Sequence, residues 1–204
     1  MQKLHLFPTT VWRSQVPQEN LEALNKKLLD KILSLKTHAD TLHSPHKWYS
    51  NRQLHMYEEF AEFNNYILDA AKTALEQIHV TGYKKLQITG CWANISEPGA
   101  THHKHTHPNN YFSGVYYVQS SSGANTITFH DPRPQVGLIR PTIKQHTTET
   151  AEAAFLTIEP GYIILFPNWL AHSVAKNESD SNRVSIAFNI MFSDYVENIS
   201  PPMW

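Results

Sequence analysis

The sequence predicts a mainly β fold, a jelly roll of two sheets (a double-stranded β-helix) with two N-terminal helices packed on one sheet. The first observation is a change of pattern: apolar residues recur at three- and four-residue steps until about residue 79, and short apolar strands follow Gly82. The second is that clusters of Gly, Pro, Ser, Asn and Asp, which form turns, separate these strands. About eight strands preceded by two helices are typical of this architecture.

Two helices are expected in the first part of the chain. Over Val16–Lys36 the leucine and isoleucine residues fall on one helix face, and Pro17 suits the first turn. Phe60–His79 carries a second apolar stripe of the same period. The segment between them, residues 37–54, is polar and rich in turn-forming residues, so we expect it to be a loop.

The strands follow in the second part. The predicted strands are Lys85–Ile95, Ser113–Gln119, Asn125–His130, Ala153–Ile158, Gly161–Phe166, His172–Lys176 and Asn182–Phe192. A further short strand is expected around Gly137–Arg140. Residues 1–82 would form the helical part and residues 83–195 the jelly-roll core of a single domain that spans residues 1–204.

Composition narrows the classes of function. The net charge is −1 and no basic run is present, so nucleic-acid binding is not expected. We expect neither a signal peptide nor a membrane span, because no apolar stretch is long enough. Cys91 is the only cysteine, which excludes a disulfide within the chain and favours a cytoplasmic protein.

Histidine is the unusual residue: the chain has 13, and four of them lie within residues 102–107. Residues two apart in a strand point to the same face, so His105 could act with His107, or with His103, and spacing alone does not choose. His172, which follows an apolar strand and a turn, is the best candidate for a third ligand. Three such ligands would leave coordination positions open on a metal. The alternative is a solvated, histidine-rich loop.

The segment "RVSIAFNI" supports a binding cavity. Arg183, Ser185 and Asn189 alternate with apolar residues, so one face of this strand is polar and the other apolar. An arginine offers a planar pair of donors to a carboxylate, and a serine two residues on can add a hydrogen bond. The alternative is an arginine at the rim, in a surface ion pair.

The order H-x-H, then a distant histidine, then R-x-S resembles the iron(II)- and 2-oxoglutarate-dependent oxygenases. More narrowly, the chain resembles a mostly uncharacterised family of such oxygenases in bacteria and their phages. The matching segments are "LFPTTVW", "HTHP", "SGVYYV", "FHDPR", "GYIILFPNWLAHSV" and "RVSIAFN". The resemblance covers most of the chain, is strongest from Trp92 to Ile190, and implies a cupin-like jelly roll.

The resemblance also selects the histidine pair. The DNA-dealkylating members of the superfamily have an asparagine, a Pro-Gly turn and then a proximal H-x-D. Asn94, Pro98-Gly99, His105 and His107 fall into this register, so His107 stands where the superfamily has an aspartate. This is a departure from the usual two histidines and one carboxylate. Asp131 is the alternative source of the missing carboxylate, and a structural turn residue is the competing interpretation.

The resemblance thus implies one metal site and one co-substrate site. The implied iron ligands are His105, His107 and His172. The implied 2-oxoglutarate-binding residues are Asn94, Tyr117, Arg183 and Ser185. Adjacent strand residues alternate, so one of Tyr116 and Tyr117 should face the cavity, and we expect Tyr117 to do so. We assign no role to His102 and His103, which we expect in a loop near the mouth.

The implied activity is hydroxylation of a C–H bond with Fe(II), 2-oxoglutarate and O2, and with release of succinate and CO2. The substrate, a small molecule or a peptidyl group, is not identified, and the oligomeric state, a homodimer included, is left open. One alternative is a three-histidine dioxygenase that uses no 2-oxoglutarate. Another is a non-catalytic jelly-roll binding module with a structural metal, which would need a fourth ligand such as His103.

Overall fold

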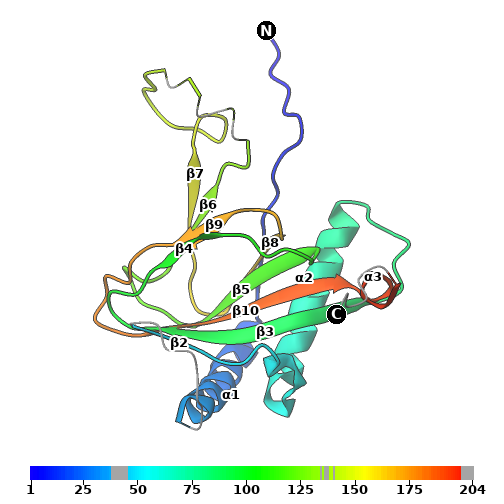
Figure 1. The fold of residues 1–204 in the computed structure, drawn as a ribbon, viewed down its shortest axis with the longest axis vertical. Coiled ribbons are helices and arrows are strands. Elements are labelled where there is room, and N and C mark those ends of the chain that lie inside the picture. The colour runs from blue at the N-terminus through cyan, green and yellow to red at the C-terminus, as the bar shows by residue number, and fades with distance from the viewer. Residues whose placement is uncertain (38–45, 134, 136–137, 140, 199–204) are drawn as a thin grey trace.

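Two antiparallel sheets form the body of the protein (Figure 1). The computed structural model describes residues 1–198 except 38–45, 134, 136–137 and 140. The larger sheet contains, in spatial order, β1 (Trp12–Gln15), β8 (Tyr162–Pro167), β5 (Phe112–Gln119), β10 (Arg183–Phe192), β3 (Leu86–Ser96) and β2 (Lys47–Tyr49). The smaller sheet contains β4 (His102–His105), β9 (His172–Val174), β6 (Thr126–His130) and β7 (Ala153–Thr157). The predicted two-sheet jelly roll is confirmed.

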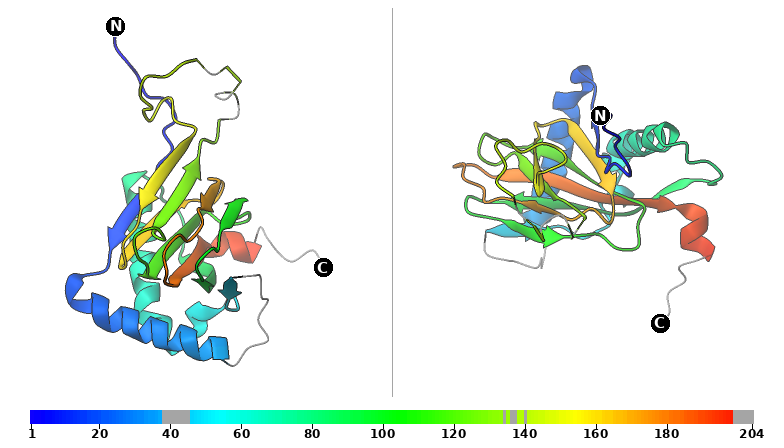
Figure 2. Two further views of the ribbon diagram at one scale, coloured as in Figure 1. Left: turned by 90° about the vertical axis from the view of Figure 1, so that its left-hand side faces the viewer. Right: turned by 90° about the horizontal axis from the view of Figure 1, so that it is seen from above.

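Both expected helices are present. They are α1 (Gln18–Thr37) and α2 (Ala61–Gln77), and two 3₁₀ turns, η1 (Leu54–Met56) and η2 (Glu58–Phe60), precede α2. Figure 2 shows α1 and α2 packed on one side of the larger sheet, with the smaller sheet on its other side. None of the helices that the structure describes is long and apolar enough to cross a membrane.

Alternation along the central strands creates two separate cores. One lies between the helices and the larger sheet, and it contains Phe63 of α2 together with Ile186 and Phe188 of β10. The other lies between the two sheets, and it contains Phe129 of β6 and Phe166 of β8. Because helices and sheet share the first core, the two parts of the chain are packed together; that residues 1–204 form one domain remains a prediction.

A glycine in β5 leaves room for an aromatic ring of β10 on the helix side of the sheet. Gly114 lies opposite Phe188 in the register of the two strands. A Cβ atom at position 114 would come within 2.1 Å of the Phe188 ring and 2.9 Å of the Ile164 carbonyl oxygen. The missing side chain therefore provides the space that the buried phenylalanine ring occupies.

Several elements differ from the predictions. Residues 37–54 are not only a loop, because they include β2, which pairs with β3, and the start of η1. The edge strand β1 and the C-terminal helix α3 (Ser193–Asn198) were not predicted either. Strands of three or four residues are too short for an alternating pattern, so only their pairing with a longer strand identifies them. Residues 137 and 140 of the expected strand at Gly137–Arg140 lie outside the described residues, and residues 138–139 form a bend.

Candidate metal centre

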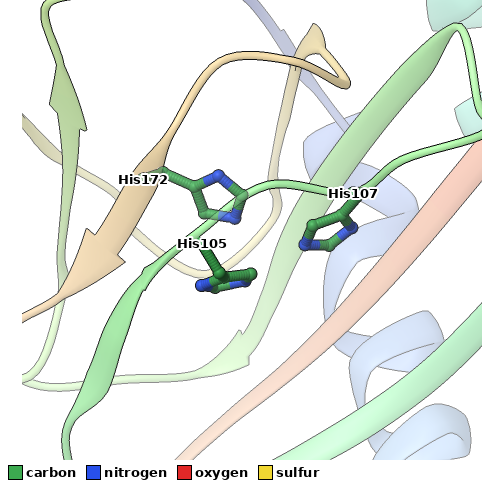
Figure 3. A group of neighbouring side chains, drawn as sticks. All are labelled: His105, His107 and His172. Carbon is green, nitrogen blue, oxygen red and sulfur yellow. The ribbon is translucent and has the colours of Figure 1, made fainter.

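Three histidine rings converge between the two sheets (Figure 3). His105 ends β4 and His172 begins β9, and the two residues are direct partners in the register of these strands. Their ring centroids are 4.3 Å apart, and His107 lies 5.0 Å from the ring of His105 and 5.1 Å from that of His172. One nitrogen from each ring lies within 4.8 Å of the other two, which suits a shared metal ion.

His107 reaches this cluster differently from what we expected. It does not share a strand with His105, because β4 ends at His105. Instead, the His107 backbone N–H donates to the Asn168 carbonyl at 3.1 Å, and the Asn168 side-chain amide donates to the His107 carbonyl at 3.1 Å. The turn after β8 therefore positions His107. The expected mechanism, two histidines on the same face of one strand, does not apply.

In each of the three rings, a hydrogen bond at Nδ1 determines which nitrogen carries the proton. Each Nδ1 faces an oxygen that only accepts hydrogen bonds, so each Nδ1 carries the proton and each Nε2 keeps its lone pair in the neutral ring. The three bonds are His105 Nδ1 to the His103 carbonyl at 2.8 Å, His107 Nδ1 to Asn189 Oδ1 at 2.9 Å, and His172 Nδ1 to the Leu170 carbonyl at 3.0 Å. Outer hydrogen bonds of this kind orient histidine ligands on metals.

Burial keeps two of these rings, His107 and His172, uncharged. Burial lowers the pKa of His172 to about 3, and it lowers the pKa of His107. Both rings are therefore neutral near pH 7, which is the protonation state that binds metals. Three imidazoles with converging Nε2 atoms fit a divalent transition metal such as iron, nickel or zinc.

A cavity beside the histidines contains the four residues expected to bind a co-substrate. Arg183, Ser185, Asn94 and Tyr117 all line it, together with the three histidines. Ser185 lies in one row across the sheet, between Asn94 of β3 and Tyr117 of β5. Arg183 occupies the next row on the same face of β10, opposite Ser96. The cavity thus has a polar wall that the larger sheet provides.

Arg183 is buried, and the described residues supply no counter-charge to it. It is 2% exposed, and no carboxylate of the described residues lies within 4.0 Å of its guanidinium. Its Nη1 donates to the Ala124 carbonyl at 3.2 Å. Burial lowers the pKa of Arg183, but an arginine remains charged in a protein. A buried, uncompensated cation is costly, so this end of the cavity suits an anionic ligand.

Asn94 provides a second sign of a ligand. Its Oδ1 atom is buried and has no hydrogen-bond partner among the described residues, although the side chain lines the cavity. Buried polar atoms are nearly always hydrogen-bonded, so an unpartnered one beside a cavity marks a place for a polar group.

The two adjacent tyrosines of β5 point to opposite sides. Tyr117 lines the cavity, and among the described residues its hydroxyl has no hydrogen bond to another protein group. Tyr116 faces the helices, where its hydroxyl donates to Asn25 Oδ1 of α1 at 2.6 Å. The binding role assigned to Tyr117 remains a prediction.

Asp131 does not join the three histidines. It follows β6, and its carboxylate accepts hydrogen bonds from Arg133 Nε at 3.0 Å and from Arg133 Nη2 at 2.8 Å. The cluster of potential ligand atoms in the described chain contains His105, His107 and His172 and not Asp131. His103 is not part of that cluster either, and its side chain is exposed.

The prediction that His102 and His103 lie in a loop is wrong, because both belong to strand β4. His102 also has a place in the site. It begins β4, lines the cavity, and its Nε2 lies 3.2 Å from the hydroxyl of Tyr49 on β2. Burial lowers its pKa to about 3. The sequence offered no signal for this pair, because β2 is too short for its pattern to be recognised.

Asn189 belongs to the predicted polar face of β10, and in the structure it is also the hydrogen-bond partner of a histidine. Its Oδ1 accepts from His107 and from Ser113 Oγ, the latter at 2.8 Å. Trp92 was also missed as a site residue: it lines the cavity, and its ring lies 5.6 Å from that of His107. Alternation from Asn94 along β3 would have placed Trp92 on the same face.

Comparison with known proteins identifies the family. Residues 90–189 match the model of a family described as "Putative 2OG-Fe(II) oxygenase". No curated protein matches the sequence.

Solved structures share the fold at low sequence identity. The non-heme α-ketoglutarate-dependent epimerase SnoN of nogalamycin biosynthesis is 11% identical, with a TM-score of 0.67, covering 91% of this chain and 79% of that one. HygX from Streptomyces hygroscopicus, with nickel and 2-oxoglutarate bound, is 10% identical, with a TM-score of 0.63 and coverages of 91% and 84%. A prolyl-4-hydroxylase from Pseudomonas putida is 13% identical, with a TM-score of 0.58 and coverages of 89% and 92%.

The matched segment contains the three converging histidines and the polar wall with Arg183. The fold, the donor set and the family model therefore agree. The chain belongs to the family of 2-oxoglutarate- and iron(II)-dependent oxygenases.

Proposed function

We propose that the protein hydroxylates a C–H bond of a small-molecule or peptidyl substrate, with consumption of 2-oxoglutarate and O2 and release of succinate and CO2. One observation carries this proposal. Three imidazoles with converging Nε2 atoms share a cavity with a buried arginine that has no carboxylate partner in the described chain. This combination suits a metal and a dianionic co-substrate side by side.

His105, His107 and His172 hold iron(II) in this proposal. The bound metal, with 2-oxoglutarate, supplies the activation of O2. The histidines keep their Nε2 atoms aimed at one point, because each Nδ1 is held by an oxygen acceptor.

Arg183 and Ser185 bind the carboxylate of 2-oxoglutarate that lies away from the metal. The guanidinium supplies a charge-assisted pair of hydrogen bonds, and the serine hydroxyl adds one more. Asn94 and Tyr117 lie in the row of Ser185. Asn94 contributes an amide oxygen that has no hydrogen-bond partner among the described residues, and Tyr117 contributes a hydroxyl. Ile127 and Phe166 add apolar walls to the same cavity, and such walls limit the access of water.

Metal and co-substrate binding test the proposal directly. Calorimetry without O2 should show that the protein binds Fe(II) and then 2-oxoglutarate, and with O2 the loaded protein should form succinate slowly without substrate. His105→Ala, His107→Ala and His172→Ala should each lose most of the metal. His103→Ala is the matched control, because this exposed histidine lies outside the cluster, and it should keep full occupancy. A folded, iron-loaded protein that neither binds 2-oxoglutarate nor forms succinate would contradict the proposal.

The departure from the superfamily's ligand set has its own test. His107→Asp should keep iron, because it restores the commoner set of two histidines and one carboxylate. Asp131→Ala should keep iron as well, since Arg133 already occupies that carboxylate. An iron-free Asp131→Ala protein beside a loaded His107→Ala protein would assign the third position to Asp131.

A second candidate is a three-histidine dioxygenase that does not use 2-oxoglutarate. The all-nitrogen donor set favours it, because the histidine cluster contains no carboxylate. The buried Arg183 favours the first candidate, since that charge would otherwise stay uncompensated. Binding of 2-oxoglutarate that depends on Arg183 separates the two.

We also propose that the protein works in the cytoplasm on a substrate that is not a nucleic acid. The single cysteine, Cys91, is buried and free, which suits a reducing compartment. Fractionation of cells that express the protein, with disruption of the outer compartment first, tests this location.

A further inference from the structure

We propose that the substrate carries an anionic group, a carboxylate or a phosphate, which Arg52 binds at the edge of the cavity beside the Trp92 indole. This inference rests on the proposed function, because it names the substrate class of the same site.

The backbone holds Arg52 next to the cavity wall. After β2 ends, the chain continues along β3, where the Cys91 backbone N–H donates to the Arg52 carbonyl at 2.9 Å and Gln53 forms a bridge with Cys91. The guanidinium carbon of Arg52 lies 5.3 Å from the centre of the Trp92 ring. A guanidinium at this distance from an indole is attracted to the ring, so the exposed side chain has a preferred orientation.

Trp92 connects this arginine to the metal centre. The indole lines the cavity, and its ring lies 5.6 Å from the ring of His107 at an angle of 30°. A group bound by Arg52 against Trp92 would therefore lie beside the proposed reaction centre.

The donors of Arg52 are available. In the part of the chain that the structure describes, no carboxylate lies within 4.0 Å of the Arg52 guanidinium, and no hydrogen bond of this side chain to another protein group is present. Arg133, in contrast, is paired with Asp131. A guanidinium with five free N–H groups and a preferred orientation can bind a carboxylate or a phosphate through two parallel hydrogen bonds.

The charge of the whole site favours the same kind of ligand. No Asp or Glu is among the described residues that line the cavity. Histidine binds a metal as a neutral ligand, so the two charges of iron(II) and the charge of Arg183 exceed the two negative charges of 2-oxoglutarate by one. A carboxylate ligand in place of His107 would have cancelled this excess. The excess charge and Arg52 both attract an anionic substrate.

Binding of small probes to the loaded protein tests this inference without turnover. The probes are phenylacetate, phenyl phosphate and the neutral phenylacetamide, titrated into protein that holds Mn(II) and 2-oxoglutarate in the absence of O2. Ligand-observed NMR reports binding, because Mn(II) broadens the lines of a probe that lies close to the metal. We expect at least one anion to bind about tenfold more tightly than the amide, and the tighter anion identifies the group.

Variants that change the charge at position 52 test whether Arg52 causes the preference for an anionic probe. Arg52→Gln should remove the preference for the anion, and Arg52→Glu should disfavour the anion relative to the amide. Arg13→Gln is the matched control, because the Arg13 guanidinium also lies over an aromatic ring, that of Tyr162 at 5.1 Å, but neither residue lines the cavity. It should keep the full preference.

Three results would overturn the inference: equal binding of anions and amide to the parent protein, an anion preference that persists in Arg52→Gln, or no broadening of any probe. All three assume protein that takes up Mn(II) and 2-oxoglutarate normally, so they leave the proposed function intact. A parent protein that binds neither Mn(II) nor 2-oxoglutarate would instead contradict the proposed function itself, and this inference with it.

Discussion

The two faces of β10 differ in almost every property although they alternate along one strand. Ile186 and Phe188 point to the helices and are fully buried in an apolar core. Arg183, Ser185 and Asn189 point to the smaller sheet and are also buried, but they line the cavity or hold one of its histidines. The strand thus buries apolar groups on one face and polar groups on the other.

This difference teaches that burial alone does not distinguish packing from function. Apolar burial stabilises the fold, whereas polar burial without protein partners costs stability and is retained where a ligand supplies the partner. Variants on the helix face should therefore change the free energy of unfolding, and variants on the cavity face should change ligand binding. The predictions below test this separation.

The largest effect should come from the helix face. Phe188→Ala removes a buried ring that contacts Phe63 of α2 edge-on at 6.1 Å, and it should lower the free energy of unfolding by about 3–5 kcal/mol. Urea denaturation measures this change. Phe155→Ala is the control, because Phe155 is 74% exposed and should change stability little. A Phe188→Ala protein as stable as the parent would remove the distinction between the faces.

The next effect belongs to the cavity face. Arg183→Ala should weaken 2-oxoglutarate binding by roughly 2–5 kcal/mol, about 30-fold or more, because a charge-assisted pair is lost in a buried site. Metal content should stay unchanged, and calorimetry and metal analysis measure both quantities. Arg13→Ala, an exposed arginine, should leave both unchanged. Unaltered 2-oxoglutarate affinity in Arg183→Ala would show that this residue does not bind the co-substrate.

A variant of Asn189 tests whether a residue of the cavity face supports metal binding by positioning His107. Asn189→Ala removes the acceptor of His107 Nδ1 and should weaken metal binding about 10- to 100-fold. Competition with a chelator measures the affinity. Asn20→Ala is the matched control, because Asn20 donates to the Tyr66 hydroxyl on the helix side of the molecule. Full metal affinity in Asn189→Ala would mean that this hydrogen bond does not position the ligand.

The buried histidines predict a pH dependence for the metal-free protein. The pKa values of His102 and His172 lie at about 3, below the value of 6.5 of an unperturbed histidine. Below pH 6.5 the unfolded chain therefore binds more protons, and the free energy of unfolding should fall as the pH falls, by up to about 1.4 kcal/mol per pH unit for each histidine. Denaturation at pH 7 and pH 5 measures the slope, and His102→Gln should reduce it. A flat profile between these values would contradict the prediction.

The smallest effects are expected for the two adjacent tyrosines of β5, Tyr116 and Tyr117. Tyr116→Phe removes the hydrogen bond to Asn25 and should lower the free energy of unfolding by about 1 kcal/mol without changing 2-oxoglutarate binding. Tyr117→Phe should leave the free energy of unfolding nearly unchanged and weaken 2-oxoglutarate binding about fivefold. Denaturation and calorimetry on both variants measure the pair. An exchange of these outcomes would reverse the assignment of the two faces.

The spacing of apolar and polar residues within single segments determined the helices and the polar face of β10. The leucine spacing of α1 and the apolar stripe of α2 require helices that bury one face, and both were predicted to within two residues at each end. The alternation in β10 places Arg183, Ser185 and Asn189 on one side for the same geometric reason. These features depend on side-chain periodicity within a single element, which the sequence contains in full.

Tertiary structure decided what depends on contacts between distant segments. His107 joins the cluster because Asn168 holds its backbone after β4 has ended. The proximity of Tyr49 and His102, and that of Arg52 and Trp92, follows from a short segment that pairs along the edge of β3. Such pairing is set by the partner strand and not by the pattern of the segment itself. The sequence alone therefore determines which faces are polar, and the packing of distant strands determines which polar groups meet.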